Sequence, residues 1–385
     1  MTYDVDALRA REFPWAAAAE AIYLNHASTG PLPQRTLDAT TEFNHLRAAP
    51  HRLTDTLQFA TLARSRELIA SLIGAAAGEI ALTTNTSYGI NLAAFSLPFA
   101  AGDVIISPDL EFPANVYPWM QLAAKRGVVY RRVECPDGVF DAEMLRREVQ
   151  DGPVRALAVS WVGFASGARV DLASLGAACR DHGVFFIVDA IQGLGPLTLN
   201  VGALAVDVLA CGAQKWLLSP WGSGFVYVRR ELIGQLEPHD VSWMGVKGSD
   251  DFTNLVDYEL AWREDARRFE FITLPFQDFA GMNASVELLH ELDPAAVARH
   301  IAHLVDVVVS WAADRDDVEL VTPAGPERRA GIVSVRPRDA RAVSDRLRAA
   351  GIWHSLREGA IRLSPHAYNT ESEMALTLDI IGRPA

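Results

Sequence analysis

Between residues 62 and 230, short apolar runs alternate with segments whose apolar residues recur at helical spacing. Runs of this length, apolar along most positions, are typical of strands buried on both faces of a parallel sheet. They cover residues 79–84, 103–107, 128–133, 154–160, 184–189, 206–210 and 224–228. One helical segment, 171–183, begins with an aspartate that can cap it and ends at a glycine. The pattern predicts an α/β fold whose ligands bind at the carboxyl ends of the strands.

The pattern changes near residue 283. A long helical pattern covers 284–312, and a helix at 340–350 lies between short strands at 331–335 and 360–364. We therefore expect a large α/β domain over 20–282 and a smaller α+β domain over 283–385. Residues 1–19 are expected to pack with the smaller domain or across the cleft.

Composition narrows the class of protein. Half of the 385 residues are hydrophobic and the net charge is −13, which argues against nucleic-acid and membrane-surface partners. No apolar run was expected to span a bilayer, and residues 1–6 lack the features of a signal peptide. The three cysteines, Cys135, Cys179 and Cys211, are scattered, which favours a reducing cytoplasm over disulfides or a metal site.

Lys215 is the most informative single residue. The chain has 35 lysines and arginines, and only three of them, at positions 125, 215 and 247, are lysines. Lys215 follows an apolar run and precedes apolar, glycine-rich sequence, where an ammonium is costly unless it is paired or neutral. Unlike arginine, lysine can lose its proton there and act as a nucleophile or Schiff-base former. A lysine that extends its amine to solvent from a strand end explains the segment equally well.

A second charged group, Asp189, ends the most apolar strand of the chain, 26 residues before Lys215. Its carboxylate is either functional or a helix cap. Adjacent strand ends would bring this acid and the Lys215 amine into one pocket, a combination that suits pyridoxal 5′-phosphate (PLP). Thr86 and Ser87 lie where a strand passes into a helix, and the N–H groups of a helix start favour a phosphate. No Gly-x-Gly-x-x-Gly follows the first strand, so a dinucleotide site has less support.

Taken together, these motifs resemble the class V aminotransferase family of fold-type I PLP enzymes, which includes cysteine desulfurases, kynureninases and isopenicillin N epimerase-like proteins. The resemblance covers nearly the whole chain. It rests on residues 23–33, the Thr86–Ser87 turn, 111–119, 188–192, 212–216 and 362–370. It implies a large domain with a mostly parallel seven-stranded sheet, PLP as cofactor, an amino-acid substrate, and a homodimer with shared active sites.

The resemblance also implies residue roles. Lys215 would hold the cofactor and later carry the substrate's proton, and Asp189 would pair with the pyridine nitrogen. Gln192 would contact the ring hydroxyl, and Thr273 would reach the partner subunit's phosphate. The residues implied at the cofactor are Thr86, Ser87, Phe112, Asp189, Gln192, Gln214, Lys215 and Thr273. Those implied at the substrate are Arg362, for the α-carboxylate, with His26, Ala27, Ser28, Phe164 and His354. His26 is open between a pocket wall and an acid or base.

Departures from the family pattern bear on the reaction. Desulfurases carry a nucleophilic cysteine shortly before the carboxylate-binding arginine, whereas residues 351–361 contain none. Gln214 stands where many relatives have histidine, and Phe164 where desulfurases have asparagine. We therefore expect chemistry on an amino acid through its external aldimine, with C–S lyase-type elimination favoured and transamination or epimerisation as alternatives. A PLP-fold binding protein without catalysis is the alternative of another class, although Lys215 and Asp189 are both present.

Overall fold

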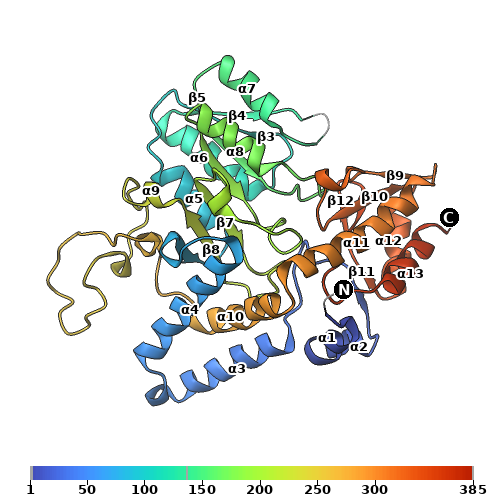
Figure 1. The fold of residues 1–385 in the computed structure, drawn as a ribbon, viewed down its shortest axis with the longest axis horizontal. Helices are drawn as coiled ribbons and strands as arrows, with labels where there is room; N and C mark the ends of the chain where they lie inside the picture. The colour runs from blue at the N-terminus through green and yellow to red at the C-terminus, as the bar shows by residue number, and fades with distance from the viewer. Residues whose placement is uncertain (1–2, 136–137, 384–385) are drawn as a thin grey trace.

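The computed structural model describes residues 3–135 and 138–383, and a seven-stranded sheet forms its centre (Figure 1). The strands are β2 (Ile80–Thr83), β3 (Val104–Pro108), β4 (Val129–Val133), β5 (Val154–Ser160), β6 (Phe185–Asp189), β7 (Val208–Gly212) and β8 (Gly224–Val228). Their order across the sheet is β2-β8-β7-β6-β5-β3-β4, and only β8 runs antiparallel to its neighbours within this described sheet. All seven predicted strands are confirmed, each within two residues of its expected ends.

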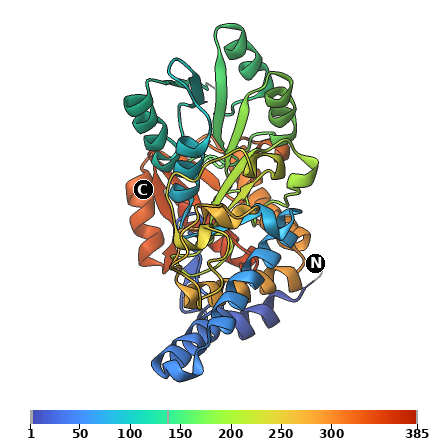
Figure 2. The ribbon, with the colours of Figure 1, turned by 90° about the vertical axis from the view of Figure 1, so that its left-hand side faces the viewer.

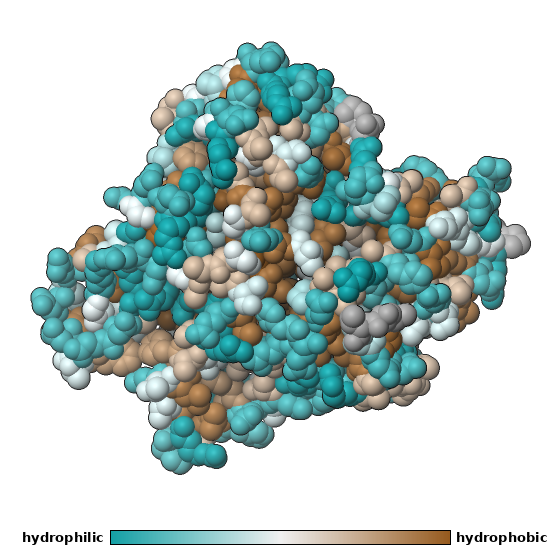
Figure 3. Space-filling view, in the orientation of Figure 1, coloured by the Kyte–Doolittle hydropathy of each residue, from teal (hydrophilic) through white to brown (hydrophobic). Residues whose placement is uncertain are grey.

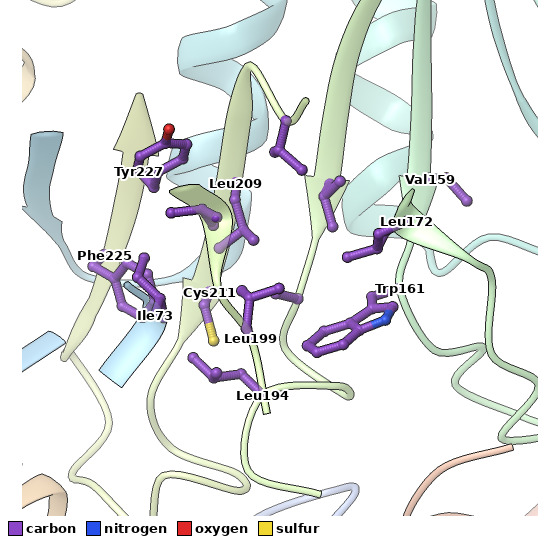
Figure 4. Close-up of a cluster of buried hydrophobic side chains, with 14 of the residues drawn as sticks. Ile73, Val159, Trp161, Leu172, Leu194, Leu199, Leu209, Cys211, Phe225 and Tyr227 are labelled. Atoms are coloured by element: carbon purple, nitrogen blue, oxygen red, sulfur yellow. The ribbon is translucent and has the colours of Figure 1, made fainter. Parts of the chain in front are cut away.

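Helices cover both faces of this sheet, which accounts for its apolar strands. One face packs against α5 (Thr86–Ser96) and α6 (Tyr117–Arg126). The other packs against α4 (Asp55–Ile73), α7 (Ala142–Gln150), α8 (Leu172–Asp181) and α10 (Phe276–Glu291). Figure 4 shows this second core, where Phe225 of β8 lies beside Ile73 of α4 and Leu209 of β7 belongs to the same cluster. The arrangement confirms an α/β fold with three layers.

The C-terminal part holds a second, antiparallel sheet in the order β12-β13-β10-β9. Its strands are β9 (Val318–Leu320), β10 (Val333–Pro337), β12 (Ser355–Arg357) and β13 (Ala360–Leu363). The helices that pack beside it are α11 (Pro294–Ala313), α12 (Ala340–Ala349) and α13 (Glu371–Ile381). The predicted strands at 331–335 and 360–364 and the helix at 340–350 are confirmed.

The single long helix expected over 284–312 is wrong, because the chain breaks between α10 and α11. Asp293 adopts a φ of 65° and its side chain accepts the Ala295 N–H, so it caps α11 instead of continuing α10. Pro294 follows, and a proline disfavours helical backbone in the residue before it. α10 packs on α3 (Gln34–Ala48) and α4, and it crosses the predicted boundary at residue 283.

The N-terminal segment lies against the C-terminal part of the chain (Figure 1). Helix α1 (Val5–Glu12) carries Arg9, whose guanidinium donates to the Tyr368 carbonyl oxygen and forms an ion pair with Glu373. The short helix α2 (Pro14–Ala17) follows, and strand β1 (Ile22–Tyr23) then pairs in parallel with β11 (Ile352–Trp353). The segment after β1 then leads from the C-terminal part to the central sheet, where Gly30 contacts Gln214 beyond β7.

Between α9 (Arg230–Ile233) and α10, the described chain has only short 3-10 turns, Trp243–Gly245 and Ala266–Phe269, and it loops outward on the left of Figure 1. Helices α3 and α4 extend at the lower end of the molecule in the turned view of Figure 2. Hydrophilic residues cover most of the face shown in Figure 3, with hydrophobic residues visible between them.

One described helix, α11, is long and apolar enough to cross a membrane by length and composition, contrary to the expectation that no run has this property. Its inward face packs against both the C-terminal sheet and the N-terminal helices, as residues Leu304, Val308 and Val297 show. A core helix passes the same test, so this finding by itself is weak support for a membrane span.

Candidate active site

Lys215 lies three residues beyond the carboxyl end of β7. The loop after β1 comes very close here: Gly30 N–H donates to the Gln214 carbonyl at 2.9 Å, and a Cβ on Gly30 would lie 2.1 Å from the Lys215 oxygen. The Lys215 amine lies 5.7 Å from the centre of the Phe112 ring. Burial lowers its pKa to about 8, although Asp189 opposes the shift. A substantial fraction of the amine is therefore neutral near physiological pH.

Asp189 ends β6, and its backbone pairs in register with Ala210 of β7. The side chain is buried, and its Oδ1 accepts one hydrogen bond among the described residues, from the Ile191 N–H at 2.9 Å. Burial raises the pKa of this carboxyl to about 6, while the Ile191 N–H and Lys215 both lower it. A cationic partner in this pocket would therefore stabilise the carboxylate.

The start of α5 lies beside these strand ends. Asn85 caps the helix by accepting the Tyr88 N–H. The N–H groups of Thr86 and Ser87 belong to the first turn, where N–H groups have no acceptor within the helix. The Thr86 hydroxyl accepts from the Gly212 N–H at 2.8 Å. A Cβ at Gly212 would lie 2.5 Å from Gln214 Oε1 and 3.3 Å from Thr86 Oγ1, so glycine there lets these side chains converge.

Arg362 lies on β13, opposite Ser355 of β12, and is 2 % exposed. Its guanidinium donates to Ser28 Oγ at 2.7 Å and to the Phe164 carbonyl oxygen at 2.6 Å. Its Nε has no hydrogen-bond partner, and no carboxylate of the described residues pairs with it. Burial, followed by the charge of Arg357, lowers its pKa to about 10. A buried cation without a counterion is costly, which indicates a site for an anion.

Phe112 and Phe164 form an aromatic wall next to the amine, with ring centres 5.3 Å apart in an edge-to-face arrangement. The Phe112 loop is fastened by its neighbour Glu111, whose carboxylate accepts from Ser160 N–H at 2.6 Å, from Ser160 Oγ and from Asn115 Nδ2. Because Ser160 pairs in register with Asp189, Glu111 ties the loop to the strand end that carries the acid.

His26 is fully buried, with Nδ1 donating to the Ser364 carbonyl at 2.8 Å and Nε2 accepting from the Tyr368 hydroxyl at 2.9 Å. Burial moves the pKa of this imidazole well below its ordinary value, so the ring is neutral. Both nitrogens are engaged, which favours the pocket-wall alternative over an acid or base. The next residue, Ala27, accepts from Gln192 Nε2 at 2.9 Å through its carbonyl.

The structure does not bring every predicted residue to this cluster. His354 contacts Ser344 of α12 and the Ile352 carbonyl through its two nitrogens, so its ring is held within the C-terminal part. Thr273, expected at the partner subunit's phosphate and not at this one, is exposed ahead of α10, and its role stays a prediction. Among nearby aromatic residues, Trp161 is 3 % exposed and belongs to the core, whereas Trp221 is 72 % exposed.

Sequence reasoning missed Ser355 and the role of Glu111. Ser355 Oγ donates to Asn25 Oδ1 at 2.7 Å and meets both Ser28 and Arg362, yet a lone serine on a short strand gives no signal. Glu111 opens the 111–119 motif, and an acidic residue directly before the aromatic Phe112 is the available signal. Ser87 and Phe112 also line an open pocket of about 760 Å³, together with Asn91, Ala114, Gln121 and neighbouring residues.

Comparison of the sequence with known protein families assigns the chain to one of them. The profile described as aminotransferase class V matches residues 22–374. The chain belongs to the class V aminotransferase family. This is a family of PLP enzymes, which accords with the amine, acid and helix start described above.

Individual relatives narrow the likeness. A probable cysteine desulfurase of Methanothermobacter thermautotrophicus is 30 % identical over 382 residues, covering 92 % of each chain. Isopenicillin N epimerase of Streptomyces clavuligerus is 29 % identical, covering 94 % of each. The solved cystine C–S lyase C-DES has a TM-score of 0.86 at 23 % identity, with 96 % of this chain and 99 % of that one covered. The last likeness bears on the fold alone.

Proposed function

We propose that this chain binds PLP and acts on an α-amino acid. The observation that carries the proposal is the buried, unpaired guanidinium of Arg362, next to a lysine amine of lowered pKa. Phe164 links the two, because its carbonyl accepts from Arg362 and its ring packs on Phe112, which faces the amine. An amino acid supplies a carboxylate for the guanidinium and an α-proton within reach of the amine.

The residues present fit the cofactor. Thr86, Ser87 and Gln214 would hold its phosphate at the α5 start, where Gly212 leaves room. Asp189 would pair with the ring nitrogen, since its buried carboxylate gains a cationic partner there, and Gln192 would meet the ring hydroxyl. When bound, PLP supplies an electrophilic carbon and an electron sink. We further propose a homodimer in which Thr273 reaches the partner subunit's phosphate.

The chain's own residues would bind the substrate and move its proton. Arg362 and Ser28 hold the substrate carboxylate, since a planar guanidinium suits a carboxylate bidentately. The neutral Lys215 amine takes the α-proton, because its pKa of about 8 leaves it a usable base near neutral pH. Phe112 and Phe164, packed edge to face, would cover one side of the bound cofactor.

For the reaction itself, we propose elimination at the substrate side chain, as in a C–S lyase. The cysteine desulfurase relative supports cleavage of a C–S bond, whereas the lack of a cysteine in 351–361 argues against a persulfide formed on the enzyme. The epimerase relative keeps epimerisation open, and transamination uses the same residues.

The test separates these outcomes. Purified protein is incubated with PLP and with L-cysteine or L-cystine, and pyruvate, sulfide and pyridoxamine phosphate are assayed separately. Elimination from L-cysteine yields pyruvate, ammonia and sulfide, and elimination from L-cystine yields pyruvate, ammonia and cysteine persulfide, which releases sulfide on reduction. Pyridoxamine phosphate accumulating without them would reject the lyase proposal, and a protein that takes up no PLP would reject the proposed function as a whole. Sedimentation of the PLP-bound protein tests the dimer.

Replacing Lys215 tests the residue assignment. We expect Lys215→Ala to reduce turnover by at least about 10³-fold while PLP stays bound through Asp189 and the α5 start, because only the amine is lost. Borohydride should fix PLP to position 215 of the native protein, as read by peptide mass, and should fix none in the variant. Native turnover in Lys215→Ala would refute the role.

A further inference from the structure

The β12–β13 hairpin has two chemically different faces. Leu356, Ile361 and Leu363 point into the C-terminal core. Because side chains alternate along a strand, Ser355, Arg357 and Arg362 lie on the opposite face. The hairpin therefore presents two arginines on one side.

This second face looks toward the active site. Arg362 donates to the Phe164 carbonyl and to Ser28, and Ser334, its partner on β10, donates to the Ala165 carbonyl. Arg357 stands two residues along the strand from Ser355, which contacts both Arg362 and Ser28. It is thus placed at the outer edge of the surface that holds the proposed substrate carboxylate.

Arg357 has no acidic partner of its own. Its side chain is exposed, and among the described residues it donates one hydrogen bond, to the Leu356 carbonyl at 3.3 Å, and joins no ion pair. Arg336, on the same sheet face, differs because it pairs with Glu319 at 2.6 Å. After burial, the charge of Arg357 is the next cause that lowers the pKa of Arg362, and it contributes to the lowering at Lys215. Its field therefore reaches the pocket.

The charges of the pocket leave room for one more anion. Arg362, Arg357 and the protonated fraction of Lys215 are cationic, and Asp189 offsets the charge of Lys215. An amino acid with a neutral side chain brings one carboxylate, for Arg362, and leaves Arg357 without an anion. We propose that Arg357 selects amino acids whose side chain ends in a second anionic group, a carboxylate or a sulfinate. This inference rests on the proposed function and adds the substrate class to it.

The position of Arg357 suits the end of a side chain. Arg362 is buried and holds the α-carboxylate, whereas Arg357 is exposed at the tip of the hairpin, next to the turn at Glu358 and Gly359. A charge contact in such a partly solvated place has a modest strength, so an effect of about tenfold on selectivity is expected.

The experiment compares Arg357→Gln with native enzyme and with Arg336→Gln as the matched control. For each, kcat/KM for pyruvate formation is measured with S-carboxymethyl-L-cysteine, whose side chain ends in a carboxylate, and with S-ethyl-L-cysteine, whose side chain ends in a neutral group. Both substrates lose a thiol on elimination. The native ratio of acidic to neutral substrates is expected to exceed one, to fall about tenfold in Arg357→Gln through KM, and to stay unchanged in Arg336→Gln. Arg357→Lys should keep part of the preference, because the charge remains.

A binding measurement separates this inference from the proposed function. With PLP-loaded protein, succinate should raise the melting temperature more than propionate, and Arg357→Gln should remove that difference. The inference would be overturned, and the proposed function left standing, by two results together. The ratio of kcat/KM for acidic over neutral substrates would be the same in native and Arg357→Gln enzyme, and succinate would raise the melting temperature no more than propionate does. A succinate effect that depends on Arg357, without turnover of any amino acid, would overturn the lyase chemistry instead.

Discussion

At the scale of single residues, the site depends on charges held where water is scarce. Burial raises the pKa of Asp189 and lowers the pKa of Lys215, which favours the neutral form of each. The charge of either group partly opposes the pKa shift of the other. Arg362 stays charged without a counterion. Such groups lower the stability of the protein by itself, which is typical of sites where a bound cofactor or substrate supplies the missing charge.

Asp189→Asn should therefore stabilise the protein without cofactor. The folded carboxyl has a pKa of about 6, above the ordinary value of about 3.9, so ionising it disfavours the folded state as the pH rises through 6. The amide still accepts the Ile191 N–H. Urea unfolding at pH 8 should show the variant about 1 to 3 kcal/mol more stable, and the gap should close below pH 4. A variant that is less stable at pH 8 would contradict this account.

At the scale of elements, the contact between α5 and the sheet positions the turn that we propose to bind phosphate. Gly89 of α5 lies against β7 and β8, where a Cβ would come 2.6 Å from the Ala210 Cβ and 2.5 Å from Val226 Cγ2. Gly212 opens the space between Thr86 and Gln214 in the same region. Small residues thus fix how closely the helix start approaches Asp189 and Lys215.

Gly89→Ala should push α5 away from the sheet. Overpacking of this kind costs about 1 to 3 kcal/mol, so unfolding in urea should occur at lower concentration, and PLP should bind more weakly because the helix start moves. Gly234→Ala, at an exposed helix end where a Cβ would meet nothing within 4 Å, is the control and should change neither. Equal stability and equal PLP affinity of the two variants would show that the close packing at Gly89 determines neither property.

At the scale of the whole molecule, the site is assembled from segments far apart in sequence. The turn at His26–Ser28, the α5 start, the Phe112 loop, the ends of β6 and β7, and β13 all contribute. The N-terminal helices pack where the large and small parts of the chain meet. There Phe13 stacks on Tyr368, and the Tyr368 hydroxyl donates a hydrogen bond to His26. The division into domains at residue 283 stays a prediction.

Arg9→Gln tests this joint. Arg9 and Glu373 form a pair with side chains 11 % and 9 % exposed, and removing one partner leaves a nearly buried charge. We expect a loss of about 3 kcal/mol in urea unfolding. The exposed pair of Arg299 and Asp293, 3.7 Å apart, provides the control, since Arg299→Gln should cost less than about 1 kcal/mol. Similar losses in both variants would mean that the joint contributes little.

The sequence by itself determined the central sheet and the main chemical groups. The strands are apolar and short, so local pattern specifies them, and Lys215, Asp189 and the Thr86–Ser87 turn stand at strand ends that a parallel sheet must gather at one edge. The break at Asp293 was missed, although Pro294 signals it, because helical periodicity continues across it.

Only the tertiary structure decided which long-range partners each side chain meets. It engaged both nitrogens of His26, held His354 against Ser344, left Arg362 without a counterion, and set Arg357 on the face of the hairpin that looks toward the site. The contacts of His26 and Arg362 join residues roughly 200 to 340 positions apart, and even the local contact of His354 depends on how the C-terminal part packs. Burial, which shifts the pKa values, exists only once those segments have packed together.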